Sequence, residues 1–285
     1  MDFLEERRLC APTQTGFRPQ MSINHHLLAL QHIIDRRIHR PARSQRKLYC
    51  CFVDLTGAYD CVQRPLMWEA LRRYGVHGRM LAAFQSLYAD AHITMKFAGR
   101  VGSSLPSLVE GCPSSPTLFG CTVDRLPAYL DAHAPDAGIL IQVGDDGELL
   151  VSHLMYADDI VLLGDSPADL QQLLDTLSGF CAALGLDVSL AKTQVMCFGL
   201  PVAAPHPTFT YAGRTLPHTD SYKYLGTTFT PAGMAGRRLG ASPQQRRQGL
   251  QQRALQVRPA RLYQQHPSPA ASLRRHRHLH SPVIL

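Results

Sequence analysis

Long apolar segments, cysteines at metal-binding spacing and an apolar leader are all missing from this 285-residue sequence. No stretch reaches the ~18 uncharged apolar residues needed to span a membrane, so no membrane partner is expected. The N-terminal residues, Met1–Cys10, mix acidic and basic side chains and predict neither a secretory signal nor an obvious transit peptide. The eight cysteines include no Cys-x-x-Cys pair, which argues against a zinc module or a disulfide framework and favours buried free thiols.

Acidic residues are missing from the last part of the chain. Residues 236–285 contain ten arginines and no Asp or Glu, whereas the preceding part has 19 basic and 22 acidic residues, a net charge near −3. The excess positive charge of the chain therefore lies in this tail. Because the tail also has few large apolar residues, we expect weak packing or disorder. A basic arm that binds nucleic acid and a misread or frameshifted end explain this composition equally well.

The rest of the sequence mixes helical and strand patterns. Apolar residues at steps of three and four over 23–38 predict a helix, and the short apolar run 48–55 predicts a buried strand. A hairpin is predicted over 139–163, and Ser166-Pro167-Ala168-Asp169 predicts a capped helix that Gly185 ends. Helices combined with hairpins indicate an α+β fold in which helices cover one face of an antiparallel sheet.

Two adjacent carboxylates interrupt the most apolar part of this hairpin, in Leu154-Met155-Tyr156-Ala157-Asp158-Asp159-Ile160-Val161. Acids are common in turns, but a tight hairpin favours Gly or Asn where φ is positive, and Ala-Asp-Asp provides neither. Like charges beside a buried strand also destabilise a fold unless a cation offsets them. From the local pattern alone, an ordinary turn and a metal site are equally good interpretations. The nearby Asp145-Asp146-Gly147 has the composition of an ordinary turn, and no function is assigned to it.

A third carboxylate, Asp54, ends the predicted buried strand, where a charge is costly without a partner. If this strand lies beside the hairpin, its carboxylate converges with Asp158 and Asp159. Carboxylates are the hard oxygen ligands that suit Mg²⁺. Two such ions can activate an attacking hydroxyl and stabilise a leaving pyrophosphate. Asp60, a few residues later, is readily explained as a helix N-cap or first-turn acid.

The segments around Asp54 and Asp158 resemble two core motifs of reverse transcriptases, Phe-Val-Asp-Leu-x-x-Ala-Tyr-Asp and Tyr-Ala-Asp-Asp. Four further segments resemble other motifs of that family: Gln14–Pro19 of the fingers, Glu110–Phe119 under the template–primer, Ala191–Met196 with its lysine, and Tyr224–Gly226 before the thumb. Each match is short, but six in the family's order over residues 14–226 are highly specific. The pattern is typical of non-LTR retrotransposons, with group II intron enzymes as the nearest relatives.

The resemblance implies a reverse-transcriptase palm, whose ferredoxin-like βαββαβ sheet carries helices on one face. It divides the chain into partial fingers over 1–47, a palm with inserted fingers elements over 48–230, and a basic tail with an incomplete thumb over 231–285. The implied activity is an RNA-directed DNA polymerase that adds deoxynucleotides to a primer 3′-hydroxyl with two Mg²⁺ ions, Mn²⁺ being an alternative. The implied partners are an RNA template, a DNA primer and deoxynucleoside triphosphates. This activity places the protein in the cytoplasm, the nucleus or both.

The resemblance also implies roles for individual residues. Asp54 and Asp158 would bind both metal ions together with the backbone carbonyl of Leu55, and Asp159 would complete the acidic cluster. The implied substrate-binding residues are Tyr59 as the gate against a ribose 2′-hydroxyl, Gly111 near the primer or nascent pair, Lys192 near the triphosphate and Arg18 near template phosphate. Without the motifs, an ordinary core tyrosine is the better interpretation of Tyr59, and Lys192 and Arg18 are ordinary surface charges.

Several positions depart from the family's pattern. Val109-Glu110 stands where Arg-Gln is usual, and Gly57 stands where Lys or Arg is usual. Only thirteen residues precede Gln14, and the arginine-rich tail does not have the pattern of thumb helices, so we expect a fragment of a longer reading frame. The main alternative is a catalytically inactive retroelement remnant that at most binds nucleic acid through its tail. A host-adopted binding module is a weaker alternative, because it predicts that the carboxylates have been lost, whereas this sequence retains them.

Overall fold

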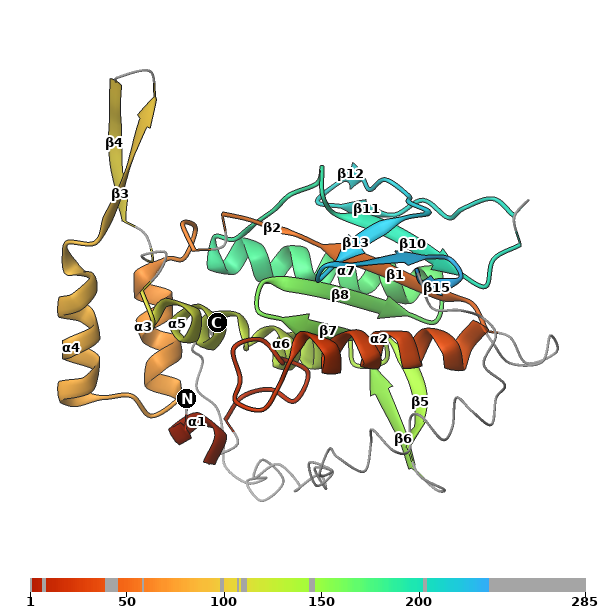
Figure 1. Cartoon of the computed structure of the whole chain (residues 1–285), viewed down its shortest axis with the longest axis horizontal. Helices are drawn as coiled ribbons and strands as arrows, with labels where there is room; N and C mark the ends of the chain where they lie inside the picture. Colours follow the sequence, from red (N-terminus) through yellow and green to blue (C-terminus); the bar gives the residue numbers. More distant parts are fainter. Residues whose placement is uncertain are drawn as a thin grey trace, which may run out of the picture. The chain divides into compact units, whose positions relative to one another are not determined.

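A four-stranded antiparallel sheet forms the centre of the fold (Figure 1). In the computed structural model its strands are β1 (Leu48–Val53), β7 (His153–Tyr156), β8 (Asp159–Gly164) and β10 (Gln194–Phe198), in the order β10-β1-β8-β7. Helices connect β1 to β7 and β8 to β10, and β7 and β8 form a hairpin. This is the ferredoxin-like βαββαβ arrangement, so the predicted fold class is confirmed.

The structure describes residues 2–6, 9–38, 46–57, 59–97, 100–106, 108, 112–143, 147–201 and 204–235. For 93–97 and 100–106 it describes the backbone alone. Residues Met1–Ala235 belong to one compact unit. The arginine-rich tail, and with it the predicted basic arm, lies outside the described residues.

A layer of helices covers one face of the sheet. These helices are α3 (Arg64–Arg73), α5 (Ser115–Val123), α6 (Leu126–His133) and α7 (Pro167–Leu184). Tyr49 and Cys51 of β1 belong to the core beneath this layer, because alternate residues of a strand point to opposite faces. Helix α7 begins with the predicted capping box, in which Ser166 and Asp169 bond each other's backbone, and ends at Gly185 with φ 68°. Both predicted boundaries of this helix are therefore confirmed.

The other face of the sheet is also covered. Helix α2 (Ile23–Ile38) packs there with a small three-stranded sheet formed by β13 (Tyr222–Tyr224), β14 (Thr227–Thr230) and β15 (Gly233–Met234). Leu48, Cys50 and Phe52 of β1 point into this second core. Double coverage explains why all six residues of β1 are buried, as expected for an unbroken apolar run. The expectation of helices on one face was therefore correct but described only half of the packing.

The remaining elements flank this framework. They are α1 (Asp2–Glu6), α4 (Gly78–Ala89), β2 (Leu55–Thr56), β3 (His92–Phe97), β4 (Arg100–Pro106), β5 (Ile139–Val143), β6 (Gly147–Val151), β9 (Asp187–Val188), β11 (Thr210–Tyr211) and β12 (Arg214–Thr215). The single hairpin predicted over 139–163 is in fact two consecutive hairpins, β5–β6 and β7–β8. Within the described residues, no helix has both the length and the apolar character that crossing a membrane requires. The division into fingers, palm and tail stays a prediction. Strand β15 lies just beyond residue 231, where the tail was predicted to begin.

Candidate active site

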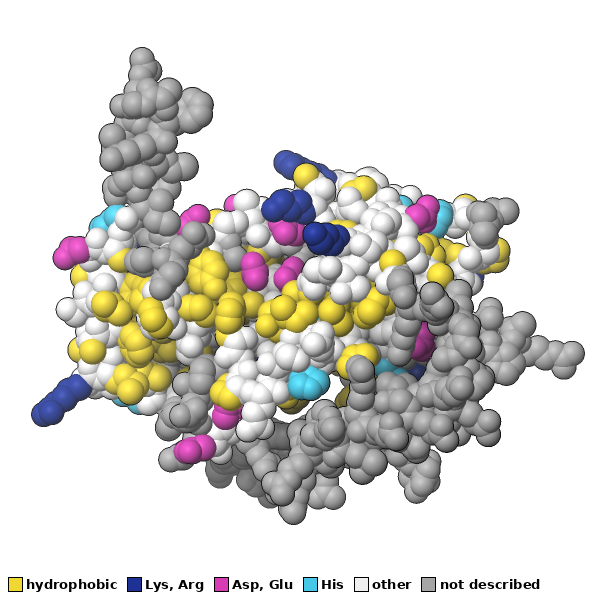
Figure 2. All heavy atoms as spheres, viewed as in Figure 1, with side chains coloured by type: hydrophobic (Ala, Val, Ile, Leu, Met, Phe, Trp, Pro, Cys, Tyr) yellow, Lys and Arg dark blue, Asp and Glu magenta, His cyan; other side chains and the backbone are white. Residues whose placement is uncertain are grey.

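Three carboxylates meet at one end of the central sheet. Asp54 directly follows β1, and the pairing of Val53 with Ile160 places it beside Asp159 at the start of β8. Asp158 occupies the turn between β7 and β8. The convergence that the sequence made conditional on strand pairing is thus present. Figure 2 shows acidic side chains with a few basic ones near the middle of the visible face, next to a broad hydrophobic area.

The environment of these carboxylates opposes their negative charge. Burial raises the pKa of Asp159 to about 6, and the charges of Asp158 and Asp54 add to this effect. Burial also raises the pKa of Asp158, with a further contribution from Asp54. Partly desolvated carboxylates with like-charged neighbours favour either a bound proton or a bound cation. The cluster has the donor chemistry of a site for a hard divalent ion.

The turn that carries Asp158 has an unusual backbone. Tyr156 pairs with Asp159, so Ala157 and Asp158 alone form the turn, and Ala157 has φ 58°. The sequence lacks Gly or Asn here, and that absence counted against a tight turn, but the turn is tight and an alanine adopts the positive φ. A left-handed alanine costs roughly 1 kcal/mol, which neighbouring contacts must offset.

The side chain of Gln14 supplies those contacts. Its Oε1 accepts hydrogen bonds from the backbone N–H of Ala157 at 2.9 Å and of Gly16 at 2.8 Å. Its Nε2 donates to the carbonyl oxygen of Ala157 at 3.2 Å. We call these three hydrogen bonds the Gln14 clamp. Two backbone bonds add to it: the N–H of Thr15 donates to Met155 O, and the N–H of Met155 donates to Thr13 O. Gln14 is 3% exposed, so the bonds are shielded from water and hold the turn in one conformation.

Gly16 lies against the same turn. A Cβ at this position would lie 2.2 Å from the backbone nitrogen of Ala157 and 2.8 Å from its Cα. No side chain fits in that space. The segment Gln14-Thr15-Gly16, which resembled a fingers motif, therefore acts in this structure as a brace for the turn that bears Asp158. Sequence reasoning missed this role, although the motif itself was noticed.

A second set of hydrogen bonds reaches the turn from the other face of the sheet. Thr15 Oγ1 lies 3.0 Å from His26 Nδ1 and donates to Met155 O at 3.1 Å. His26 Nε2 lies 2.9 Å from the hydroxyl of Tyr224, which in turn lies 3.4 Å from the carbonyl oxygen of Asp159. Burial lowers the pKa of His26 to about 4, so the ring is neutral near pH 7. This relay, which no sequence motif revealed, ties α2 and β13 to the carboxylate cluster.

Lys192 is a basic residue in contact with the carboxylate cluster. Its Nζ is 3.4 Å from Asp54 Oδ2, and its side chain is 71% exposed. The loop around it docks on the same residue, because Asp54 donates its N–H to Thr193 Oγ1 and accepts the N–H of Ser189 at its carbonyl. An exposed ion pair of this kind contributes little stability, so the ammonium group is free to exchange partners.

The side chain of Arg18 is largely buried and makes its contacts within the N-terminal segment. Its guanidinium makes two bonds to the carboxylate of Glu5, at 2.7 and 2.8 Å, and it also donates to the carbonyl oxygens of Ala11 and Gln14. The Arg18 side chain is 12% exposed. These contacts hold the N-terminal segment around the brace and leave little of the guanidinium for a template phosphate. The phosphate role stays a prediction that this geometry does not favour.

The other predicted residues lie as follows. Leu55 begins β2 and pairs with Val188, with its side chain buried. The half-buried ring of Tyr59 lies 5.3 Å from the ring of Phe119 in α5. Gly111, together with the departure at Glu110, lies outside the described residues. The roles assigned to these residues by resemblance stay predictions.

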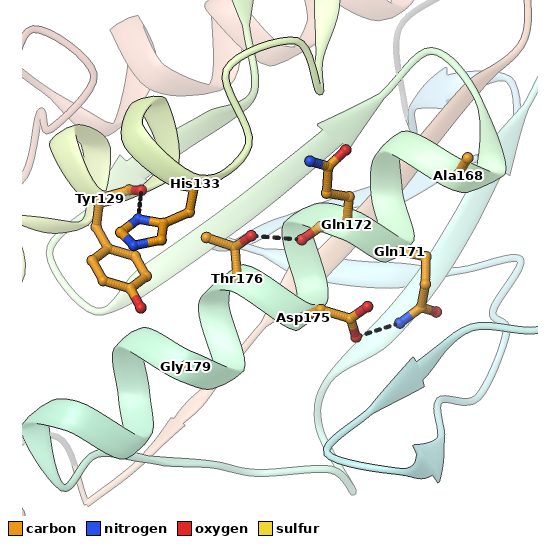
Figure 3. Close-up of a pocket in the computed structure, with 8 residues that line it drawn as sticks. All are labelled: Tyr129, His133, Ala168, Gln171, Gln172, Asp175, Thr176 and Gly179. Atoms are coloured by element: carbon orange, nitrogen blue, oxygen red, sulfur yellow. Dashed lines mark hydrogen bonds between the residues drawn. The ribbon is translucent and has the colours of Figure 1, made fainter.

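A groove of about 600 Å³ lies on the helical layer, between α6 and α7 (Figure 3). The carboxylate cluster is not part of its lining. Several of its polar groups bond within their own helices: His133 to the carbonyl of Tyr129, Thr176 to the carbonyl of Gln172, and Gln171 to Asp175. Gln171 also bonds the backbone of Thr210 in β11. Because the groove does not gather groups of the kind found at the carboxylates, we assign the functional site to the carboxylates.

The chain is similar to polyproteins of retrotransposable elements. The chain is 27% identical over 220 residues to the retrovirus-related Pol polyprotein from type-1 retrotransposable element R2 of Popillia japonica, covering 73% of this chain and 34% of that protein. It is 26% identical over 237 residues to the corresponding polyprotein of type-2 element R2DM of Drosophila melanogaster, covering 78% and 21%. The chain therefore spans about a third or less of the length of these relatives.

Solved structures support the fold. Apo telomerase from Candida tropicalis superposes with a TM-score of 0.51 at 11% identity, covering 81% of this chain and 38% of that one. A family model described as reverse transcriptase (RNA-dependent DNA polymerase) matches residues 2–229. Given this match over most of its length, the chain belongs to the reverse transcriptase family.

Proposed function

We propose that this chain is the catalytic part of an RNA-directed DNA polymerase of a non-LTR retrotransposon, which extends a primer 3′-hydroxyl with deoxynucleotides on an RNA template. The observation that carries the proposal is the convergence of Asp54, Asp158 and Asp159 at one end of the sheet. Membership of the family and the retrotransposon relatives support it. Its localisation to the cytoplasm or nucleus follows from this activity alone.

The donor set fits Mg²⁺. Three carboxylates offer hard oxygen ligands, and the raised pKa values of Asp158 and Asp159 indicate negative charge that neighbouring groups do not balance. We assign Asp54, Asp158 and the carbonyl of Leu55 as ligands of two ions, with Asp159 completing the cluster. When bound, such ions lower the pKa of an attacking hydroxyl and neutralise charge on the transferred phosphoryl group.

The chain's own residues position the reaction. The hydrogen bonds of Gln14 to Ala157 fix the turn that carries Asp158. The fixed position matters for the reaction, because a turn displaced by about 1 Å would misplace the carboxylate relative to Asp54. The 3′-oxygen of the primer bonds to the α-phosphorus of the deoxynucleotide as the bond from that phosphorus to the bridging oxygen breaks; the hydroxyl proton passes to water, and pyrophosphate departs. Lys192 can exchange its partner Asp54 for a phosphate oxygen once cations neutralise the cluster. Tyr59 and Gly111 are assigned to the nucleotide and the primer on resemblance alone.

Primer extension tests the proposal. Folded full-length protein is incubated with poly(rA)–oligo(dT), Mg²⁺ and labelled deoxythymidine triphosphate, in parallel with Asp158→Asn and with Asp145→Asn from the neighbouring hairpin. We expect Asp158→Asn to lower incorporation by roughly 10³-fold or more, since it removes a charged ligand without changing side-chain volume. Asp145→Asn should incorporate normally. Absence of incorporation by all three proteins, each with an intact unfolding transition, would instead favour the inactive remnant.

A further inference from the structure

A second set of ligand-type side chains gathers at the outer edge of β10, away from the catalytic turn in sequence. Cys197 of β10, His206 of the following loop and His218 beyond β12 each place one ligand atom within 4.8 Å of the others. The three residues come from three separate segments, so the tertiary fold brings them together. The sequence, which has no Cys-x-x-Cys pair, does not indicate this cluster.

His218 is oriented as a metal ligand would be. Its Nε2 lies 2.8 Å from the carbonyl oxygen of Pro207, which can only accept, so Nε2 carries the proton. In the neutral ring, Nδ1 is then a lone pair, and it faces the sulfur of Cys197 at 4.0 Å. A histidine whose second nitrogen is held by a backbone carbonyl is the usual arrangement around protein metal sites. A thiol is only a weak donor, so the Nδ1 lone pair has no strong partner among the residues that the structure describes.

His206 completes the cluster from the solvent side. Its ring centroid lies 4.9 Å from that of His218, and it is exposed, whereas Cys197 is 5% exposed. The segment that carries His206 also presents the carbonyl of Pro207 that orients His218. Tetrahedral Zn²⁺ holds sulfur at about 2.3 Å and nitrogen at 2.0–2.1 Å, which places ligand atoms roughly 3.3–3.7 Å apart. The observed separations, 4.0 Å for one pair and within 4.8 Å for all three, are somewhat longer than that range, so the side chains would have to move closer to hold an ion.

We propose that Cys197, His206 and His218 bind a Zn²⁺ ion, with the fourth position open to water or to an added ligand. One thiolate and two imidazoles are the soft and intermediate donors that select zinc over magnesium, so the site is chemically separate from the carboxylates.

The ion would link the segment around His218 to β10, the edge strand of the sheet. Val195 of β10 bonds the backbone on both sides of His218: its N–H donates to Pro217 O and its carbonyl accepts the N–H of Thr219, each at 2.9 Å. These two bonds are all that pairs this edge in the described residues. A metal bridge at Cys197 would hold the segment in place, and with it the strand that follows the Lys192 loop.

Metal content tests the proposal directly. The full chain is freed of metal with a chelator, loaded with Zn²⁺ or Co²⁺, passed through gel filtration and assayed for bound metal. We expect one ion per chain, a thiolate-to-cobalt charge-transfer band, and a Tm that rises by roughly 5–10 °C at zinc one hundred times above Kd. His206→Gln and Cys197→Ser should each lose the cobalt band and most of the Tm shift. His206 is exposed, so its variant reports binding even if the Cys197 variant folds poorly.

Matched controls separate this site from adventitious binding. Cys112 is the competing thiol, because hydrogen bonds from Ser114 and Tyr88 lower its pKa to about 7. The tail also carries His276, His278 and His280. Cys112→Ser and the triple variant His276→Gln, His278→Gln, His280→Gln should keep the ion, the band and the Tm shift. Loss of metal in either control with retention in His206→Gln, or no stoichiometric metal in the unaltered chain, would overturn the proposal.

Discussion

Two hairpins that follow each other in the chain, β5–β6 and β7–β8, each carry an adjacent pair of aspartates at the turn. The strands of β5–β6 are largely solvent-facing, with Leu140 and Leu149 about half exposed at 49% and 48%. The strands of β7–β8 lie inside the fold, with Val161 and Leu162 fully buried. The two hairpins carry the same pair of acids in the sequence, but the strands that flank the pair are largely exposed in one hairpin and buried in the other.

The difference between the hairpins arises from their neighbours. β8 pairs with β1, which brings Asp54 to the cluster, and Gln14 clamps the turn at Ala157. β5 and β6 pair only with each other among the described strands. An acidic turn becomes a candidate metal site where other elements remove water from it and fix its geometry, and the identity of the acids is not enough.

Among substitutions that leave the three carboxylates in place, the largest expected effect comes from filling the space at Gly16. Gly16→Ala places a methyl group 2.2 Å from the backbone of Ala157, so the turn must move. We expect incorporation to fall by about 100-fold or more, since displacement of about 1 Å is enough for such a loss. Gly147→Ala is the matched control: its Cβ would lie 2.8 Å from Val143 O, but in the exposed hairpin. Equal incorporation by the two variants would show that the brace does not position Asp158.

A smaller effect is expected from removing the clamp while leaving the space open. Gln14→Ala leaves the N–H groups of Ala157 and Gly16 and the carbonyl of Ala157 without their side-chain partner. We expect the free energy of unfolding to drop by about 2–3 kcal/mol and incorporation by about tenfold or more. Gln142→Ala, at an exposed position of β5, should change neither quantity measurably. A Gln14→Ala chain as stable and active as the Gln142→Ala chain would contradict the role of the clamp.

The smallest expected effect is electrostatic. Asp159 has a pKa of about 6 against an ordinary value of 3.8, so the folded chain holds a proton that the unfolded chain has lost. Metal-free stability should therefore decrease as pH rises from about 4 to about 6, by roughly 1–2 kcal/mol after allowing for partial exposure. Mg²⁺ should restore it above pH 6. Chemical denaturation at several pH values measures this slope.

The variant Asp159→Asn tests whether Asp159 produces this pH dependence of stability. The variant should flatten the pH dependence and raise metal-free stability at pH 7, because it removes a charge that the fold disfavours. Asp145→Asn, from the other hairpin, should keep the full slope. A slope of the same size in Asp159→Asn would mean that other groups produce it.

Much of this fold could be read from local patterns. Periodicity predicted α2 and β1, and the Ser166 capping box and Gly185 predicted both ends of α7, because each signal lies within one element. The family motifs predicted the order of the palm elements and identified all three carboxylates. Their convergence followed once β1 was placed beside β8.

What only the tertiary structure decided involves contacts between distant residues. Gln14 bonds Ala157 across 143 positions, and His26 meets Tyr224 across 198. The left-handed conformation of Ala157 depends on the first of these contacts, and no propensity of alanine predicts it. The Cys197 cluster likewise exists only because the segment around His218 returns to the edge of β10. Composition and periodicity report whether a residue is buried and in which element it lies. Which distant polar atoms then satisfy one another is set when the elements pack, because buried hydrogen-bonding groups must find partners wherever the fold places them.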